Sequence, residues 1–179
     1  MDDDDPQVHA SDEQRAVAVD LRHFVRLAHL VLDREDVLTD AQVSLVFVDE
    51  PTIAEYNERF LDTPGPTDVL SFPIDDDGVG PGRWPDAGGR GPGQGSDPPD
   101  VPTLLGDVMV CPPYAAREAQ RRGIPVEREM ELLVVHGLLH LLNYDHMEAE
   151  EADRMQRRER ELLASFRAAT PGSDGAGGA

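Results

Sequence analysis

The chain has 179 residues, a length that fits one domain with its own hydrophobic core and excludes two domains of ordinary size. Its formal net charge of -20 argues against a broad basic surface for nucleic acid, and all 16 basic residues are arginine. The longest apolar run, 132–135, is far shorter than the roughly 18 residues of a membrane span, and Asp2 to Asp5 stand where a signal peptide carries positive charge. These features predict a cytoplasmic protein without a membrane span.

The pattern of apolar residues predicts an alternation of helices and strands. Apolar residues at helical spacing indicate helices, and β-branched runs bounded by proline or glycine indicate strands. Ser11 or Asp12 is placed to cap the first helix. The predicted strands cover 42–48, 69–74 and 105–111, and the predicted helices cover 12–35, 49–60, 114–122, 126–142 and 147–168.

This order of elements predicts one α+β domain over residues 6–169, with helices packed on one sheet. Residues 75–103 are rich in Gly, Pro and Asp and have no hydrophobic period, which predicts a mobile insertion without chemistry. Residues 170–179 form a Gly-rich tail that we expect to be disordered.

Three of the six histidines lie within eleven residues, at His136, His140 and His146. Residues four apart share one helix face, so the first two imidazoles can face one ion, and a turn after the helix can bring the third to it. Three imidazoles leave one tetrahedral position of a zinc ion open for water, as in catalytic sites. The pattern therefore predicts one Zn²⁺ per chain. Asp145 is either an orienting partner of a ligand imidazole or a turn residue.

The spacing of these histidines is also that of the metzincin metalloproteases. Those enzymes place a glutamate base directly after the first histidine and a glycine three residues after the second. The two positions hold Gly137 and Asn143 here. A metalloprotease of this kind is therefore retained only as an alternative function.

Two motifs in order carry a family resemblance: the segment from His136 to His146, and Thr67-Asp68-Val69-Leu70-Ser71-Phe72-Pro73. With Leu105-Gly106-Asp107-Val108 and the later Met155, they resemble the YbeY family of endoribonucleases. The resemblance implies a zinc-hydrolase-like α+β fold with a small mixed sheet, and zinc on the three histidines. It also implies cleavage of single-stranded RNA in the 3′-end maturation of 16S ribosomal RNA and in ribosome quality control, with the small ribosomal subunit as partner.

One departure from the family concerns RNA binding, because Leu61 stands where many members have arginine. Phosphate contact must then come from other cations, and we predict substrate-binding roles for Arg121, Arg122 and Arg154, which could equally lie on solvated helix faces. Ser71 is expected either to donate a hydrogen bond to substrate as a catalytic-site residue or to be structural. The acidic charge and Leu61 leave open a further alternative, a ribosome-associated binding factor that cuts nothing.

Overall fold

The computed structural model describes residues 6–37, 41–74, 103–144 and 149–170. Within these ranges the chain forms four strands and five helices, and the described elements begin at Gln7 and end at Ala169. In chain order they are β1 (Gln7–Asp12), α1 (Leu21–Arg34), β2 (Ala41–Phe47), α2 (Glu50–Leu61), β3 (Val69–Pro73), β4 (Thr103–Val110), α3 (Pro112–Arg122), α4 (Val126–Leu141) and α5 (Ala149–Ala169).

The strands form one mixed sheet in the order β1-β2-β4-β3. The first three strands of this order are parallel, and β3 runs antiparallel to β4 at the edge. This confirms the predicted α+β class with a small mixed sheet. The predicted insertion at 75–103 and the tail at 170–179 lie outside the described residues, except at their limits. Thr103 is already part of β4, so the insertion prediction was one residue too long.

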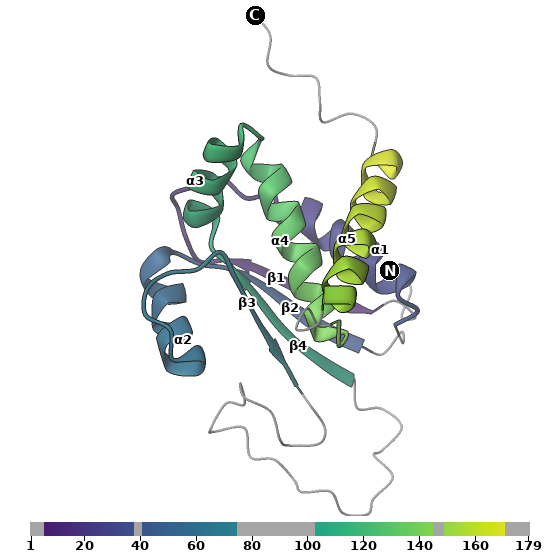
Figure 1. Cartoon of the computed structure of the whole chain (residues 1–179), viewed down its shortest axis with the longest axis horizontal. Helices are drawn as coiled ribbons and strands as arrows, with labels where there is room; N and C mark the ends of the chain where they lie inside the picture. The colour runs from purple at the N-terminus through teal and green to yellow at the C-terminus, as the bar shows by residue number, and fades with distance from the viewer. Residues whose placement is uncertain (1–5, 38–40, 75–102, 145–148, 171–179) are drawn as a thin grey trace, which may run out of the picture.

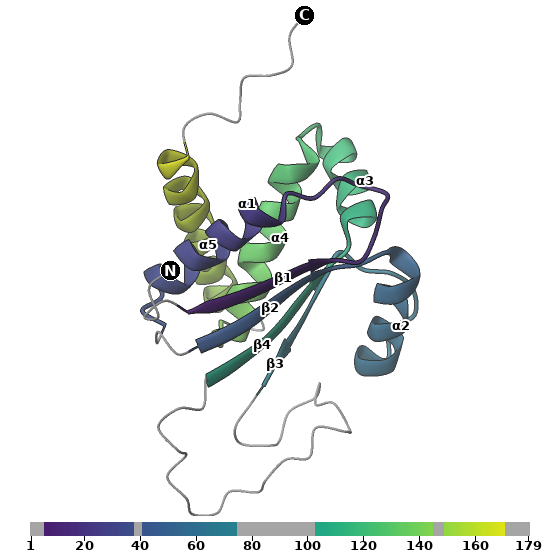
Figure 2. The ribbon, with the colours of Figure 1, turned by 180° about the vertical axis from the view of Figure 1, so that it is seen from behind.

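Helices cover the two faces of the sheet unequally (Figures 1 and 2). Helices α1, α4 and α5 lie over one face, where they bury the main core together with β2 and β4. The short helix α2 lies on the other side and buries a smaller cluster around Ile53, Phe72 and Met109. No helix in the described ranges is long and apolar enough to cross a membrane.

The predicted helix over 12–35 was wrong in its first third. Residues 7–12 instead form β1, which pairs in parallel with β2. The buried Gln14 then turns the chain, because its side-chain oxygen accepts from the backbone N–H groups of Ala16 and Val17. The helix begins only at Leu21, where Asp20 caps it. The other predicted elements match within two residues at each end.

Two glycines let α4 and β3 approach β4 closely. A Cβ atom at Gly137 of α4 would lie 2.5 Å from Val108 Cγ1, inside van der Waals contact. Gly106 of β4 has a φ of +136°, and a Cβ there would lie 2.2 Å from the carbonyl oxygen of Phe72. The close packing of the histidine-bearing helix on the sheet therefore depends on the absence of side chains at both positions.

Candidate active site

Two of the three predicted ligands meet on α4, as their spacing predicted. The Nε2 atoms of His136 and His140 lie 3.0 Å apart, and the ring planes cross at 79°. Both imidazoles are half-buried at the surface of the helix, although the residues around them on α4 are buried. Periodicity alone brings them together, since positions four apart lie one above the other on a helix.

A buried carboxylate from α5 contacts the first of these imidazoles. Glu159 Oε1 lies 2.6 Å from His136 Nδ1. A carboxylate oxygen at this distance is placed to accept a hydrogen bond from Nδ1. In a neutral imidazole held in this way, Nε2, the nitrogen that faces His140, is the one that can bind a metal ion.

The chemistry of this pair suits a zinc ion. Two nitrogen ligands, each about 2.0 to 2.1 Å from one tetrahedral zinc, lie about 3.3 Å apart, close to the separation of these Nε2 atoms. A ligand imidazole that gives its second nitrogen to a carboxylate is the usual arrangement in zinc sites. Among the described residues, no group of three or more His, Cys, Asp or Glu side chains is arranged so that it could hold a metal ion. His146, the predicted third ligand, and Asp145 both lie outside the described residues.

The chain that leads toward His146 is fixed where α4 ends. Asn143 has a φ of +64°, and the N–H of Tyr144 donates to the carbonyl of Leu139, which closes the helix. The Tyr144 hydroxyl donates to Glu35 at 2.8 Å, and Arg158 Nε donates to the same carboxylate at 2.6 Å. Burial, followed by the hydrogen bond to Glu35, raises the pKa of Tyr144. The start of this loop is therefore held by α1 and α5.

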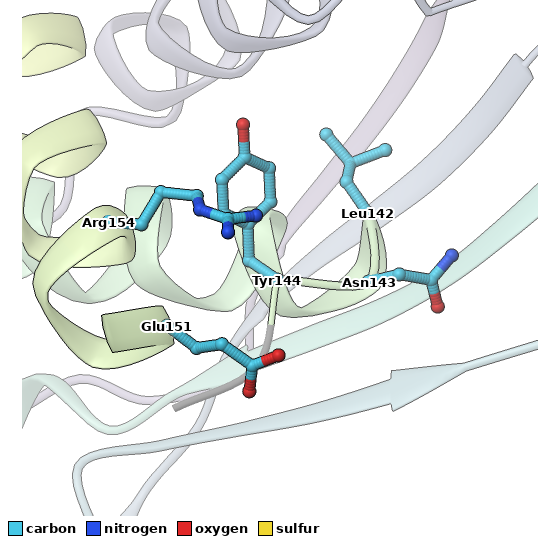
Figure 3. A pocket seen from close by; sticks show the side chains of 5 residues that line it. All are labelled: Leu142, Asn143, Tyr144, Glu151 and Arg154. Atoms are coloured by element: carbon cyan, nitrogen blue, oxygen red, sulfur yellow. The ribbon is translucent and has the colours of Figure 1, made fainter. Parts of the chain in front are cut away.

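A polar pocket of about 180 Å³ lies between the end of α4 and the first turns of α5 (Figure 3). Figure 3 shows Glu151 and Arg154 extending from α5 toward the residues that follow α4. The pocket is lined by Leu142, Asn143, Tyr144, Glu151 and Arg154. Of the three predicted substrate-binding arginines, Arg154 thus shares a pocket with the segment between His140 and His146.

The other two predicted arginines lie at the opposite end of α4. Arg122 pairs with Glu129 at 2.6 Å, and Arg121 pairs with Glu118 at 2.5 Å. Glu129 precedes His136 by seven residues, which on a helix is about 10 Å along the axis. Both guanidinium groups are therefore engaged by carboxylates and distant from the histidine pair.

Ser71 contacts the histidine helix itself. Its hydroxyl donates to the carbonyl oxygen of Gly137 at 3.1 Å, directly beside the first histidine. This hydrogen bond ties the edge strand β3 to α4. A donor role of Ser71 toward substrate stays a prediction, and the structure adds a positioning role.

Sequence reasoning did not find Glu159, although a signal was present. On the predicted last helix, Met155, Glu159 and Leu163 are spaced four apart, so they share one face. The two apolar members are buried, and the acid between them is 7% exposed. An acidic residue in an apolar stripe is a candidate for a specific buried partner.

The fold and the histidine pair define a class of α+β proteins that carry two facing imidazoles on a helix packed against a mixed sheet. Within this class, the sequence profile of the family Endoribonuclease YbeY matches residues 7–167. The chain belongs to this family.

Relatives agree with this assignment, and a solved structure shares the fold. The chain is 43% identical over 150 residues to Endoribonuclease YbeY of Beutenbergia cavernae, covering 84% of this chain and 91% of the relative. It is 42% identical over 154 residues to Endoribonuclease YbeY of Thermobifida fusca, covering 86% and 90%. The solution structure of TM1509 from Thermotoga maritima has the same fold, with a TM-score of 0.54 at 21% identity over 96% of this chain and all of that one.

Proposed function

We propose that this protein is a zinc-dependent endoribonuclease that cuts single-stranded RNA in the cytoplasm. The proposed role is 3′-end maturation of 16S ribosomal RNA and ribosome quality control, with the small ribosomal subunit as partner. Family membership supports endoribonuclease activity. The observation that carries the metal proposal is the pair of Nε2 atoms 3.0 Å apart on His136 and His140, with His146 as the proposed third ligand.

The residues of this chain have separable roles in the proposal. When bound, the zinc ion supplies a Lewis acid and lowers the pKa of water at its open position. Gly137 and Ser71 hold the histidine helix against the sheet. Arg154 offers a cation to an RNA phosphate beside the site, since it lines the neighbouring pocket.

Peptide hydrolysis of the metzincin kind is disfavoured by the packing of α4. In those proteases a glutamate base follows the first histidine, at the position of Gly137. A Cβ atom at Gly137 would lie 2.5 Å from Val108 Cγ1 and 3.1 Å from Ser71 Oγ. This position points into the sheet, so a glutamate side chain would not fit there and could not act as the general base.

The decisive experiment is cleavage of a single-stranded RNA by the purified protein, with and without zinc. We expect cleavage that stops when a chelator removes zinc, returns on adding it back, and falls steeply as salt rises, because arginine contacts displace counterions from phosphates. Intact RNA with zinc bound would favour the non-catalytic binding factor. Cleavage of a generic peptide would favour the protease.

Two variants locate the RNA contact. Arg154→Ala should lower kcat/KM by about 10-fold or more, since a charge-assisted hydrogen bond contributes about 1.5 to 3 kcal/mol. Arg160→Ala is the matched control, an exposed arginine on α5 that is not among the pocket residues. Leu61 is 52% exposed at the end of α2, so Leu61→Arg should fold normally and increase cleavage. Equal loss in both alanine variants would argue against a contact specific to Arg154.

A further inference from the structure

We propose that Glu159 is a positioning residue for the metal site, which holds His136 in the tautomer and ring orientation that present Nε2 to the ion. The inference rests on the proposed function, because it takes His136 as a zinc ligand. Glu159 contacts the Nδ1 side of the His136 ring, whereas the metal ion would bind on the Nε2 side. Glu159 would therefore act only through His136.

The contact is well formed and directional. The Glu159 side chain is 9% exposed and that of His136 is 34% exposed, so the carboxylate is buried and the imidazole reaches the surface. In the part of the chain that the structure describes, His136 is the one hydrogen-bond partner of Glu159. The carboxylate therefore has no second structural tie there that would account for its burial.

The surroundings of Glu159 favour an apolar residue. Met155, Leu162, Leu163 and Phe166 of the same helix are all buried in the main core. Buried ion pairs can often be replaced by apolar groups without loss of stability, because removing two charged groups from water is expensive. A carboxylate at this position is better explained by its effect on His136. A cation beyond the imidazole would also offset its desolvation.

Helix α4 offers a matched control. Glu131 of α4 is also buried and lies 3.0 Å from an imidazole, that of His23. It additionally accepts two hydrogen bonds from Arg167. This carboxylate joins three helices, and among the described residues it contacts His23 and Arg167 rather than either of the two ligands on α4, so its removal should affect stability alone.

The experiment measures Zn²⁺ affinity by chelator competition at one fixed pH, together with urea unfolding of the zinc-free proteins. Glu159→Gln and Glu159→Leu should bind zinc about 10- to 100-fold more weakly, the usual effect of losing an orienting partner. Zinc-free Glu159→Gln, which keeps an oxygen acceptor for Nδ1 of His136, should retain most of the parent's stability. Glu131→Gln should unfold at lower urea and keep the parent's zinc affinity.

Several results would overturn the inference. If the parent binds zinc and both Glu159 variants bind it equally well, Glu159 does not position the ligand, while the proposed function stands. If the variants lose zinc only in proportion to lost folding, as judged by the Glu131→Gln control, Glu159 is a structural tie. If the Leu variant fails to fold, the Gln variant decides. A parent that binds no zinc overturns both proposals.

Discussion

Helix α4 takes part in two histidine–glutamate pairs, each with a buried carboxylate, that differ in their surroundings. In the first pair, His23 of α1 is buried, and its ring meets those of Phe24 and Phe166 edge to face. Its Nε2 contacts Glu131 and its Nδ1 lies 3.6 Å from Glu127, so a carboxylate oxygen faces each ring nitrogen. This pair is closed on all sides.

In the second pair, as far as the described residues show, a carboxylate faces Nδ1 and another imidazole faces Nε2. The Nδ1 atom of His136 contacts Glu159, and its Nε2 atom faces the imidazole of His140 at the helix surface. The comparison teaches that a buried His–Glu contact does not by itself mark a functional site. The direction of the second nitrogen decides whether the imidazole is a structural group or can serve as a ligand.

The largest expected effect is on metal content. The purified protein should bind close to one zinc per chain, and His136→Ala, His140→Ala or His146→Ala should remove most of it, because two imidazoles alone make a weak site. Metal analysis after dialysis measures this. A full complement of zinc in any of the three variants would show that the ligand set is wrong.

The converse substitution addresses the closed pair. His23→Ala should lower the free energy of unfolding by about 2 to 4 kcal/mol, since it removes a buried ring and leaves a cavity, while zinc content stays unchanged. Urea unfolding and metal analysis test both halves of the statement. His9→Ala, an exposed histidine on β1, is the control and should change neither quantity. Loss of zinc in His23→Ala would show that the His23–Glu131 pair also supports metal binding, contrary to a purely structural role.

A smaller effect is expected from substitutions that shift helix α4 but leave His136 and Glu159 unchanged. Gly137→Ala should destabilise the fold by about 1 to 3 kcal/mol, as overpacking does, and should weaken zinc binding because the helix must move away from Val108. Ser71→Ala removes only one hydrogen bond to the same carbonyl and should lower stability by about 1 kcal/mol. The reverse order of these two effects would contradict the steric account.

The smallest effect at neutral pH concerns the buried thiol of Cys111. Burial raises the pKa of the Cys111 thiol to about 11. The thiol should therefore react slowly with iodoacetamide in the folded protein. Because the folded pKa is raised, the thiol's contribution to stability is complete below pH 9 and is lost as pH rises from about 9 to 11. Rapid alkylation at pH 8 of the folded protein would contradict this.

The parts of the fold that local sequence patterns encode were predicted well. Helix α4 has a continuous apolar pattern and was predicted within one residue at each end, and the histidines four apart met as expected. Strand β1 was missed because its sequence, Gln-Val-His-Ala-Ser-Asp, has little β-branched character. Its conformation is set by pairing with β2, a contact between residues about 35 apart in sequence.

The site shows the same division between local and distant information. The pair on α4 is local, whereas Glu159 lies 23 residues after His136 and meets it only when α5 packs on α4. Ser71 contacts Gly137 across 66 residues. Neither contact follows from spacing along the chain, although an acid in a buried stripe pointed to an unidentified partner.

The two glycines at the junction of α4, β3 and β4 bear on how sequence variation in such a chain is interpreted. Gly106 and Gly137 leave no room for a methyl group, since a Cβ at either position would overlap Phe72 or Val108. In a saturation mutagenesis library glycine should be strongly preferred at both positions, because every other residue there costs stability. Intolerance to substitution beside His136 would then have two separate origins, ligand chemistry at the histidine and excluded volume at the glycine, which only a zinc-binding readout of the surviving variants can tell apart.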